Sequence, residues 1–323
     1  MTNLPAITSR DPLRRGFVAL PWAVACGMLT YAFIAGGYFV TVMSFAMIYA
    51  VFVIGLNIFM GTAGQVSFGH NAFAALSGYT SAVLTATYYW EPIAAFAAGL
   101  ALALLVALVV GWPTLRLKGH YLAMATLAIG LIVYEIATQW QSVTQGYMGI
   151  SGISPLAFWG YEIVSERGKL FALVLIVLLA SLAAARLRAS RFGRALAAIA
   201  GSEDAARALG IDVAHYKLAA FLVSAAYAAL AGSLFVHVVE FVSPEVFGLH
   251  MVVLAFTMLY VGGIGTLGGP ILGAVIVSLL PEMFRGFKDY QDLFYGAGLI
   301  ILLIYAPKGL AALSDLLPRK GRA

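Results

Sequence analysis

Charged residues are scarce in this sequence. They make up only 10% of the 323 residues, whereas hydrophobic residues make up 62%. Soluble domains carry about 25% charged residues, so this chain cannot cover a surface that faces water. From Gly16 to Trp90 there is no Asp, Glu, Lys or Arg, a stretch long enough for about three membrane spans. The composition indicates an integral membrane protein and excludes soluble enzymes, nucleic-acid-binding proteins and disordered proteins.

Cysteine and the common catalytic motifs are also nearly absent. The single cysteine, Cys26, allows no intrachain disulfide, no cysteine-based zinc site and no iron–sulfur cluster. The sequence contains no H-E-x-x-H helix and no nucleophile elbow. It also lacks the phosphate-binding pattern G-x-x-x-x-G-K-[ST], so any ATP hydrolysis must come from another chain. We therefore expect a protein that is not an enzyme and that binds no cofactor or metal itself.

Glycines, prolines and charged clusters divide the apolar sequence into about ten segments of membrane-span character. Helices are expected, because the segments lack the alternation of a membrane β-strand. Several are too short to cross a bilayer unaided, which favours broken or re-entrant helices. The predicted spans are 17–35, 39–60, 70–88, 92–112, 121–136, 170–185, 218–239, 249–261, 267–280 and 293–305.

The basic residues indicate the orientation of these spans. With the N-terminus inside, most of the 19 Lys and Arg residues fall on the cytoplasmic side, as the positive-inside rule requires. We therefore predict a cytoplasmic segment 1–16, a transmembrane domain 17–305 with a cytoplasmic loop 186–217, and a cytoplasmic tail 306–323. The basic and then apolar N-terminus resembles a signal peptide, but its apolar run is too long, and we expect a retained first helix.

Asp, Glu, Lys and Arg are almost missing from the predicted spans, which contain only Glu135, one residue from a helix end. Transport coupled to a proton or ion gradient usually needs such groups inside the membrane, so it is poorly supported. A sodium site of carbonyls and hydroxyls stays open as an alternative. His237 and His250 are expected to reach the membrane interface from helix ends.

Two glycine-rich breaks interrupt the apolar helices, at 61–71 and 262–270. Unwound backbone at membrane depth is tolerated where it lines a cavity or is enclosed by protein, which favours a translocation path. Ordinary small-residue helix packing is the alternative. The candidate path residues are Asn57, Gly61, Gly64, Gln65, Ser67, His70, Gly263 and Gly265.

The loop 186–217 is amphipathic and predicts two short helices, at 191–200 and 202–209. Ser202 is a natural N-cap, acidic residues follow it in the first turn, and Gly210 is a natural C-terminal stop. The second helix is either a solvated connection or a docking element for a cytoplasmic motor. The candidate coupling residues are Glu203, Asp204, Ala206, Arg207 and Gly210.

Several sequence blocks, in order along nearly the whole chain, resemble one known family. Residues 55–58 and 61–73 read GLNI and GTAGQVSFGHNAF, and residues 115–123 read LRLKGHYLA. Further blocks lie at 190–195, 206–211, 262–270 and 307–310. They are similar to the permease subunits of bacterial branched-chain amino acid ABC importers, specifically the M-type (LivM-like) subunit.

The resemblance implies a multi-pass protein of the bacterial inner membrane that carries leucine, isoleucine or valine. It implies a heterodimer with an H-type permease subunit, two cytoplasmic ATPases that bind ATP, a periplasmic substrate-binding protein, and contact with membrane lipid but not nucleic acid. The residues 204–210 (DAARALG) match the E-A-A-x-x-x-G docking loop of ABC permeases with Asp in place of Glu, although the later part of that motif is not recognisable. The alternatives are an ABC permease for urea or short amides, and a passive channel.

Overall fold

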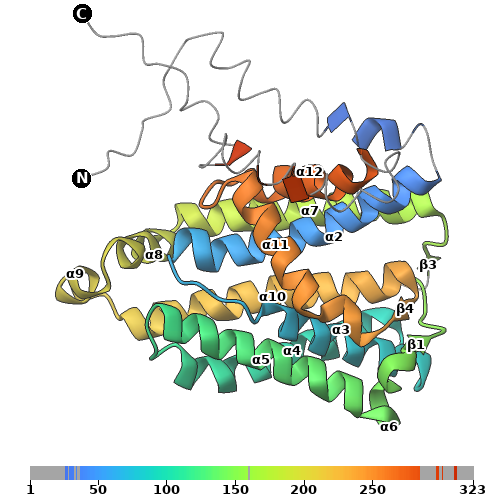
Figure 1. The fold of residues 1–323 in the computed structure, drawn as a ribbon, viewed down its shortest axis with the longest axis horizontal. Helices are drawn as coiled ribbons and strands as arrows, with labels where there is room; N and C mark the ends of the chain where they lie inside the picture. The colour runs from blue at the N-terminus through green and yellow to red at the C-terminus, as the bar shows by residue number, and fades with distance from the viewer. Residues whose placement is uncertain are drawn as a thin grey trace, which may run out of the picture.

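The computed structural model describes residues 37–158 and 161–283, with isolated positions between 26 and 34 and between 296 and 310. Within these residues most of the chain is helical, and the long helices lie side by side along the longest axis (Figure 1). Five helices are long and apolar enough to cross a membrane: Tyr38–Thr62, Pro92–Thr114, His120–Gln139, Glu166–Ala189 and Val213–Val239. The fold is therefore that of an all-α, polytopic membrane protein.

The elements follow one another in a simple order. The first half contains α2 (Tyr38–Asn57), which continues as the π-helix η1 (Ile58–Thr62), then α3 (His70–Ala86), α4 (Pro92–Thr114), α5 (His120–Gln139), α6 (Gln141–Thr144) and η2 (Gly146–Met148). The short strands β1 (Ile150–Ser151), β2 (Ala157–Phe158) and β3 (Tyr161–Glu162) come next. The second half contains α7 (Glu166–Ala189), α8 (Arg191–Gly201), α9 (Glu203–Ala208), α10 (Val213–Val239), β4 (Phe241–Val242), η3 (Pro244–Phe247), α11 (Leu249–Gly262) and α12 (Gly269–Met283).

Every predicted span between residues 39 and 280 corresponds to a helix. The largest differences are at α7 and α10, which extend into the charged sequence that we predicted as loop, so that Arg186 and Lys217 are helical. The predicted spans 17–35 and 293–305 lie largely outside the described residues, as do the segments 1–16 and 306–323. The number of spans and the cytoplasmic position of both termini stay predictions.

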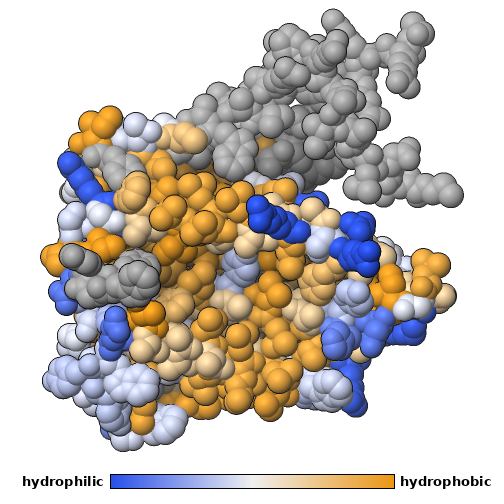
Figure 2. All heavy atoms as spheres, turned by 180° about the vertical axis from the view of Figure 1, so that it is seen from behind, coloured by the Kyte–Doolittle hydropathy of each residue, from blue (hydrophilic) through white to orange (hydrophobic). Residues whose placement is uncertain are grey.

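Helices α2 and α10 form the centre of the bundle. Helix α10 packs against α2, α3 and α4, while α2 also packs against α7 and α12. Helix α4 lies at the periphery, and its fully buried residues are all small: Ala95, Gly99, Ala103, Ala107 and Gly111. Small residues allow close helix approach in a membrane, while several large side chains of α4, among them Leu105, Leu108 and Val109, are exposed. Figure 2 shows a broad hydrophobic face between more hydrophilic ends.

Buried polar side chains join α3 to α10. The hydroxyl oxygens of Ser77 and Ser233 lie 2.7 Å apart, and Ser81 Oγ lies 2.6 Å from His237 Nε2. The other ring nitrogen of His237, Nδ1, lies 2.7 Å from the carbonyl oxygen of Ser154. The expectation that His237 reaches the membrane interface is therefore wrong, because its ring is buried among polar partners.

The end of the molecule opposite α9 carries the short strands (Figure 1). Strand β1 pairs antiparallel with β4, and β2 pairs with β3. Near this end Lys169 is buried, although it precedes the predicted span, and its Nζ lies 2.9 Å from Glu240 Oε1 and 3.2 Å from Glu166 Oε1. Both carboxylates compensate the buried ammonium, and the pair with Glu240 joins the start of α7 to the end of α10.

Candidate functional site

The first break is a short extended segment that follows the π-helix η1. Gly64 has a φ of 67°, a backbone conformation that glycine adopts readily. The side chains that follow alternate, as expected of extended chain: Gln65 and Ser67 are buried, while Val66 between them is exposed. One edge of the break therefore faces the protein and the other faces outward.

Asn57 joins the first break to the second. Its Nδ2 donates to the carbonyl oxygen of Thr266 at 2.7 Å, and its Oδ1 accepts from the amide N–H of Gly265 at 2.7 Å. Gly61 lies beneath this pair, and a Cβ there would overlap Asn57 Oδ1 and the Gly265 backbone. Two breaks that are more than 200 residues apart in sequence therefore form one unit.

The second break is organised by one threonine and two glycines. Gly263 and Gly265 have φ values of 114° and 75°. The hydroxyl of Thr266 donates to the carbonyl oxygen of Gly263 at 2.7 Å and accepts from the amide N–H of Gly269 at 3.0 Å. Thr266 thereby caps the start of α12, so the break is a defined turn between α11 and α12.

Ser67 and His70 are buried where the first break enters α3. Ser67 Oγ lies 2.9 Å from His70 Nδ1, and the imidazole ring is surrounded by Phe59, Phe73 and Phe221. This position is interior rather than exposed to an open path. Beside it, the amide N–H of Phe68 donates to Thr126 Oγ1 at 3.0 Å, which fixes the break against α5.

The small cavity beside Asn57 has a volume of about 20 Å³. Such a volume holds about one water molecule and cannot admit an amino acid. The candidate path residues divide into four groups. Asn57, Gly61, Gly263 and Gly265 belong to the joined breaks, Ser67 and His70 form an interior pair, Gln65 is buried, and Gly64 lies beside Ala200 of α8. Their roles in translocation stay predictions.

The predicted pair of short helices is confirmed as α8 and α9. Ser202 Oγ accepts from the amide N–H of Ala205 at 3.2 Å, so it is the N-cap of α9. Gly210 follows the helix with a φ of 82°. Ala206 is buried, whereas Arg207 and Asp204 are exposed and form an ion pair at 3.0 Å. Figure 1 shows α9 protruding from one end of the molecule.

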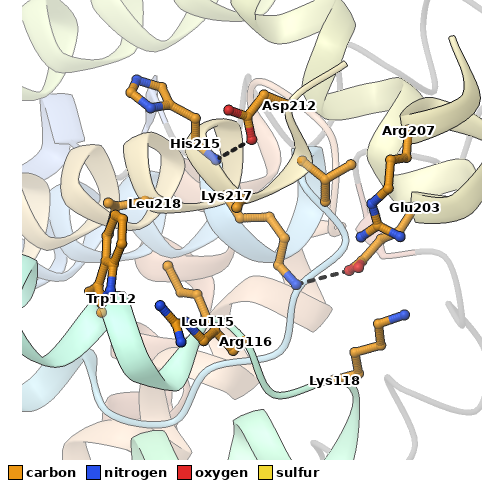
Figure 3. Close-up of a pocket in the computed structure, with 13 residues that line it drawn as sticks. Trp112, Leu115, Arg116, Lys118, Glu203, Arg207, Asp212, His215, Lys217 and Leu218 are labelled. Carbon is orange, nitrogen blue, oxygen red and sulfur yellow. Dashed lines mark hydrogen bonds and ion pairs between the residues drawn. The ribbon is translucent and has the colours of Figure 1, made fainter. Parts of the chain in front are cut away.

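Glu203 connects α9 to the first break, a connection that we did not predict. Its Oε1 accepts from Gln65 Nε2 at 3.1 Å. The same oxygen accepts from Lys217 Nζ at 2.9 Å (Figure 3). Burial opposes ionisation, but the hydrogen bond and charge of Lys217 outweigh it and hold the pKa of Glu203 below its ordinary value. The Glu203 carboxylate of α9 thus binds both the first break and α10.

Residues 37–158 and 161–283 contain no group of three or more His, Cys, Asp or Glu side chains that could hold a metal ion.

Comparison with known proteins places these features in a family context. Residues 38–303 match the family model described as the permease component of branched-chain amino acid transport systems. The chain is 32% identical to the high-affinity branched-chain amino acid transport system permease protein LivM of Escherichia coli (strain K12), over 95% of this chain and 77% of that protein. It is 27% identical to LivH of the same organism, over 81% of this chain and 90% of that protein. No solved structure shows a significant match.

Proposed function

The chain belongs to the family of branched-chain amino acid transport permeases, and from this membership we propose that it is the M-type permease subunit of a bacterial ABC importer. It is a transport subunit rather than an enzyme. It moves leucine, isoleucine or valine across the inner membrane, with both of its termini in the cytoplasm. The similarity to LivM over 95% of the chain supports the M-type assignment.

The proposed complex contains an H-type permease, two cytoplasmic ATPases and a periplasmic binding protein. The similarity of this chain to LivH as well as to LivM supports a pair of related permeases. Because the sequence lacks a phosphate-binding loop, ATP is bound and hydrolysed on the partner ATPases.

The translocation path lies between the two permeases in this proposal. Val66, on the outward edge of the first break, is exposed, and so are Val253 and Tyr260 on α11. Phe68 of the break stacks on Phe256 of α11, with ring centroids 4.4 Å apart, and this joins the two segments into one surface. A largely apolar surface without acidic or basic side chains suits the side chain of a branched-chain amino acid.

The observation that carries the mechanism is the position of Glu203. Helix α9 docks on an ATPase and moves when the ATPase dimer closes around ATP. Because Glu203 is bonded to Gln65 and to Lys217, that motion is transmitted to the first break and to α10 together. The Asn57 hydrogen bonds extend it to the second break, so the two breaks move as one unit and access alternates.

Uptake of labelled leucine into proteoliposomes tests this function. We expect uptake by the complete complex with the binding protein outside and ATP inside, and we expect it to continue after ionophores have collapsed all ion gradients. Vesicles that hold the complex without ATP are the control and should not accumulate leucine.

Other outcomes identify the alternatives. Uptake that stops with the ionophores and ignores ATP would contradict an ABC importer. Downhill flux through this chain alone would indicate a passive channel. ATP-driven accumulation of urea or a short amide in place of leucine would indicate an ABC permease for those substrates.

A further inference from the structure

A cavity of about 330 Å³ lies at the end of the molecule that carries α9. Three segments form it: the end of α4 with the turn that follows, helix α9, and the first turns of α10 (Figure 3). None of the candidate path residues lines this cavity. Its charged and polar lining residues are Arg116, Lys118, Glu203, Arg207, Asp212, His215 and Lys217.

The lining favours an anion, because its acidic residues are already engaged. Glu203 is bonded to Lys217, and Asp212 accepts from the amide N–H of His215 as the N-cap of α10. Lys118 and Arg207 both form an ion pair with Asp204, at 4.0 Å and 3.0 Å, and Asp204 lies outside the lining. Among residues 37–158 and 161–283, no carboxylate forms an ion pair with Arg116. A positive potential therefore remains in the cavity.

The same cavity is continuous with the outer, apolar side of α4. The guanidinium carbon of Arg116 lies 5.7 Å from the ring centroid of Trp112, which also lines the cavity and is exposed. One to two turns earlier on α4, the side chains of Leu105, Leu108 and Val109 are exposed as well. Exposed tryptophan is typical of the membrane interface, so an apolar stripe leads from the hydrocarbon region to the basic cavity.

We propose that this cavity binds the phosphate headgroup of an anionic phospholipid, with an acyl chain lying along α4. Arg116 and Lys118 contact the phosphate, and Trp112 packs against the glycerol region. Basic pockets on the cytoplasmic side of membrane proteins bind such headgroups. A soluble anion would use the basic residues but would gain nothing from the apolar stripe, which is the reason for choosing a lipid.

Binding is measured on the complete complex in detergent, by native mass spectrometry and by thermal unfolding during titration with phosphatidylglycerol. Each Lys or Arg near an anionic headgroup strengthens binding by roughly fivefold. The double variant Arg116→Gln/Lys118→Gln should therefore weaken the apparent affinity about 25-fold. The matched control is Arg186→Gln, which removes an exposed positive charge from α7, outside the cavity lining, and should bind like the unmodified protein.

Two comparisons separate the lipid from other ligands. Phosphatidylcholine should neither be retained nor raise the unfolding temperature, and inorganic phosphate should protect much less than phosphatidylglycerol. Equal protection by phosphate would overturn the lipid assignment in favour of a soluble anion. Unchanged phosphatidylglycerol affinity in the double variant, or an equal loss in Arg186→Gln, would overturn the site.

Discussion

Glu203 and Asp204 are neighbours with the same charge but opposite surroundings. The side chain of Glu203 is 18% exposed and its partner Lys217 is 3% exposed, whereas the side chain of Asp204 is 81% exposed. A buried ammonium that loses its carboxylate is costly, while an exposed ion pair contributes little. Two adjacent substitutions can therefore separate the buried connection from surface charge.

We expect Glu203→Gln to destabilise the protein by about 3 kcal/mol and to reduce leucine uptake, because Lys217 is left without a compensating charge. Asp204→Asn, the matched control, should change stability by less than about 1 kcal/mol. Thermal unfolding of the purified complex measures the first effect and proteoliposome uptake the second. Equal effects of the two variants would contradict the special role of Glu203.

The pH dependence of this difference has a definite sign. A carboxyl group with a lowered pKa stabilises the folded state fully above its unfolded value, 4.5, and loses that contribution as the pH falls through the folded pKa. The stability difference between the unmodified protein and Glu203→Gln should therefore be constant from pH 5.5 to 8. A difference that disappears within that range would show that Lys217 does not hold Glu203 ionised.

Gly64 combines a positive φ with a close neighbour. A Cβ at this position would lie 3.0 Å from Ala200 Cβ, whereas Gly152, with a φ of 73°, has no atom within 4 Å of a built Cβ. Both Gly64→Val and Gly152→Val incur the backbone penalty of roughly 1–2 kcal/mol, but only the first disturbs the contact between the break and α8.

Uptake assays on inserted protein should therefore show a large loss for Gly64→Val and a small one for Gly152→Val. Membrane insertion, followed by the amount of full-length chain in the membrane fraction, should be similar for both. Normal uptake by Gly64→Val would assign the first break to ordinary helix packing.

At the scale of elements, the sequence predicts the helices well and their polar contacts poorly. Long apolar runs that end at glycine, proline or charge locate α3, α4 and α11 to within a few residues, because membrane burial makes apolar length decisive. The capped helix α9 was also predictable, since Ser202 and Gly210 act locally. The π-helix η1 and the bonds of Glu203 to Gln65 and Lys217 were not. Gln65 and Glu203 are 138 residues apart, and composition carries no signal for such a pairing.

Helix α9 ends at Gly210, where glycine is needed for its backbone conformation and not for lack of space. Gly210 has a φ of 82° and no atom within 4 Å of a built Cβ, while Gly201, at the end of α8, is equally open but has no positive φ. Gly210→Ala should destabilise the end of α9 by roughly 1 kcal/mol. Gly201→Ala should be neutral or slightly stabilising, because alanine favours the helix.

The consequence for coupling can be measured by co-purification of the ATPases and by substrate-stimulated ATP hydrolysis. Both should fall for Gly210→Ala and stay unchanged for Gly201→Ala. If both variants retain the ATPases and full hydrolysis, α9 is a solvated connection, and the turn at residues 115–119 is the next candidate for the coupling contact.

The whole molecule has two chemically different ends. One carries α9 and the basic cavity, and the other carries the short strands and the ion pairs of Lys169. From the positive-inside rule we expect the first end to face the cytoplasm. Leu209 and Met148 are 80% and 85% exposed. Leu209 follows α9, which lines the same cavity as the turn at 115–119, whereas Met148 belongs to η2, beyond the far end of α5. The two residues therefore lie at opposite ends of the molecule.

Cysteine labelling tests this orientation in a Cys26→Ser background. A membrane-impermeant maleimide should label Met148→Cys in intact spheroplasts and should label Leu209→Cys only after permeabilisation. Labelling of both from the same side would contradict the predicted topology.

The hydrogen bonds of Asn57 to Gly265 and Thr266 also have a consequence for synthesis. The ribosome adds about 5–20 residues per second, and the two partners are 208 residues apart, so Asn57 waits roughly 10–40 s for its partners to be made. During that time a buried side-chain amide lacks its hydrogen bonds inside a newly inserted helix. Nascent chains that stop before Gly265 keep this defect permanently, and we expect membrane proteases to recognise and degrade them.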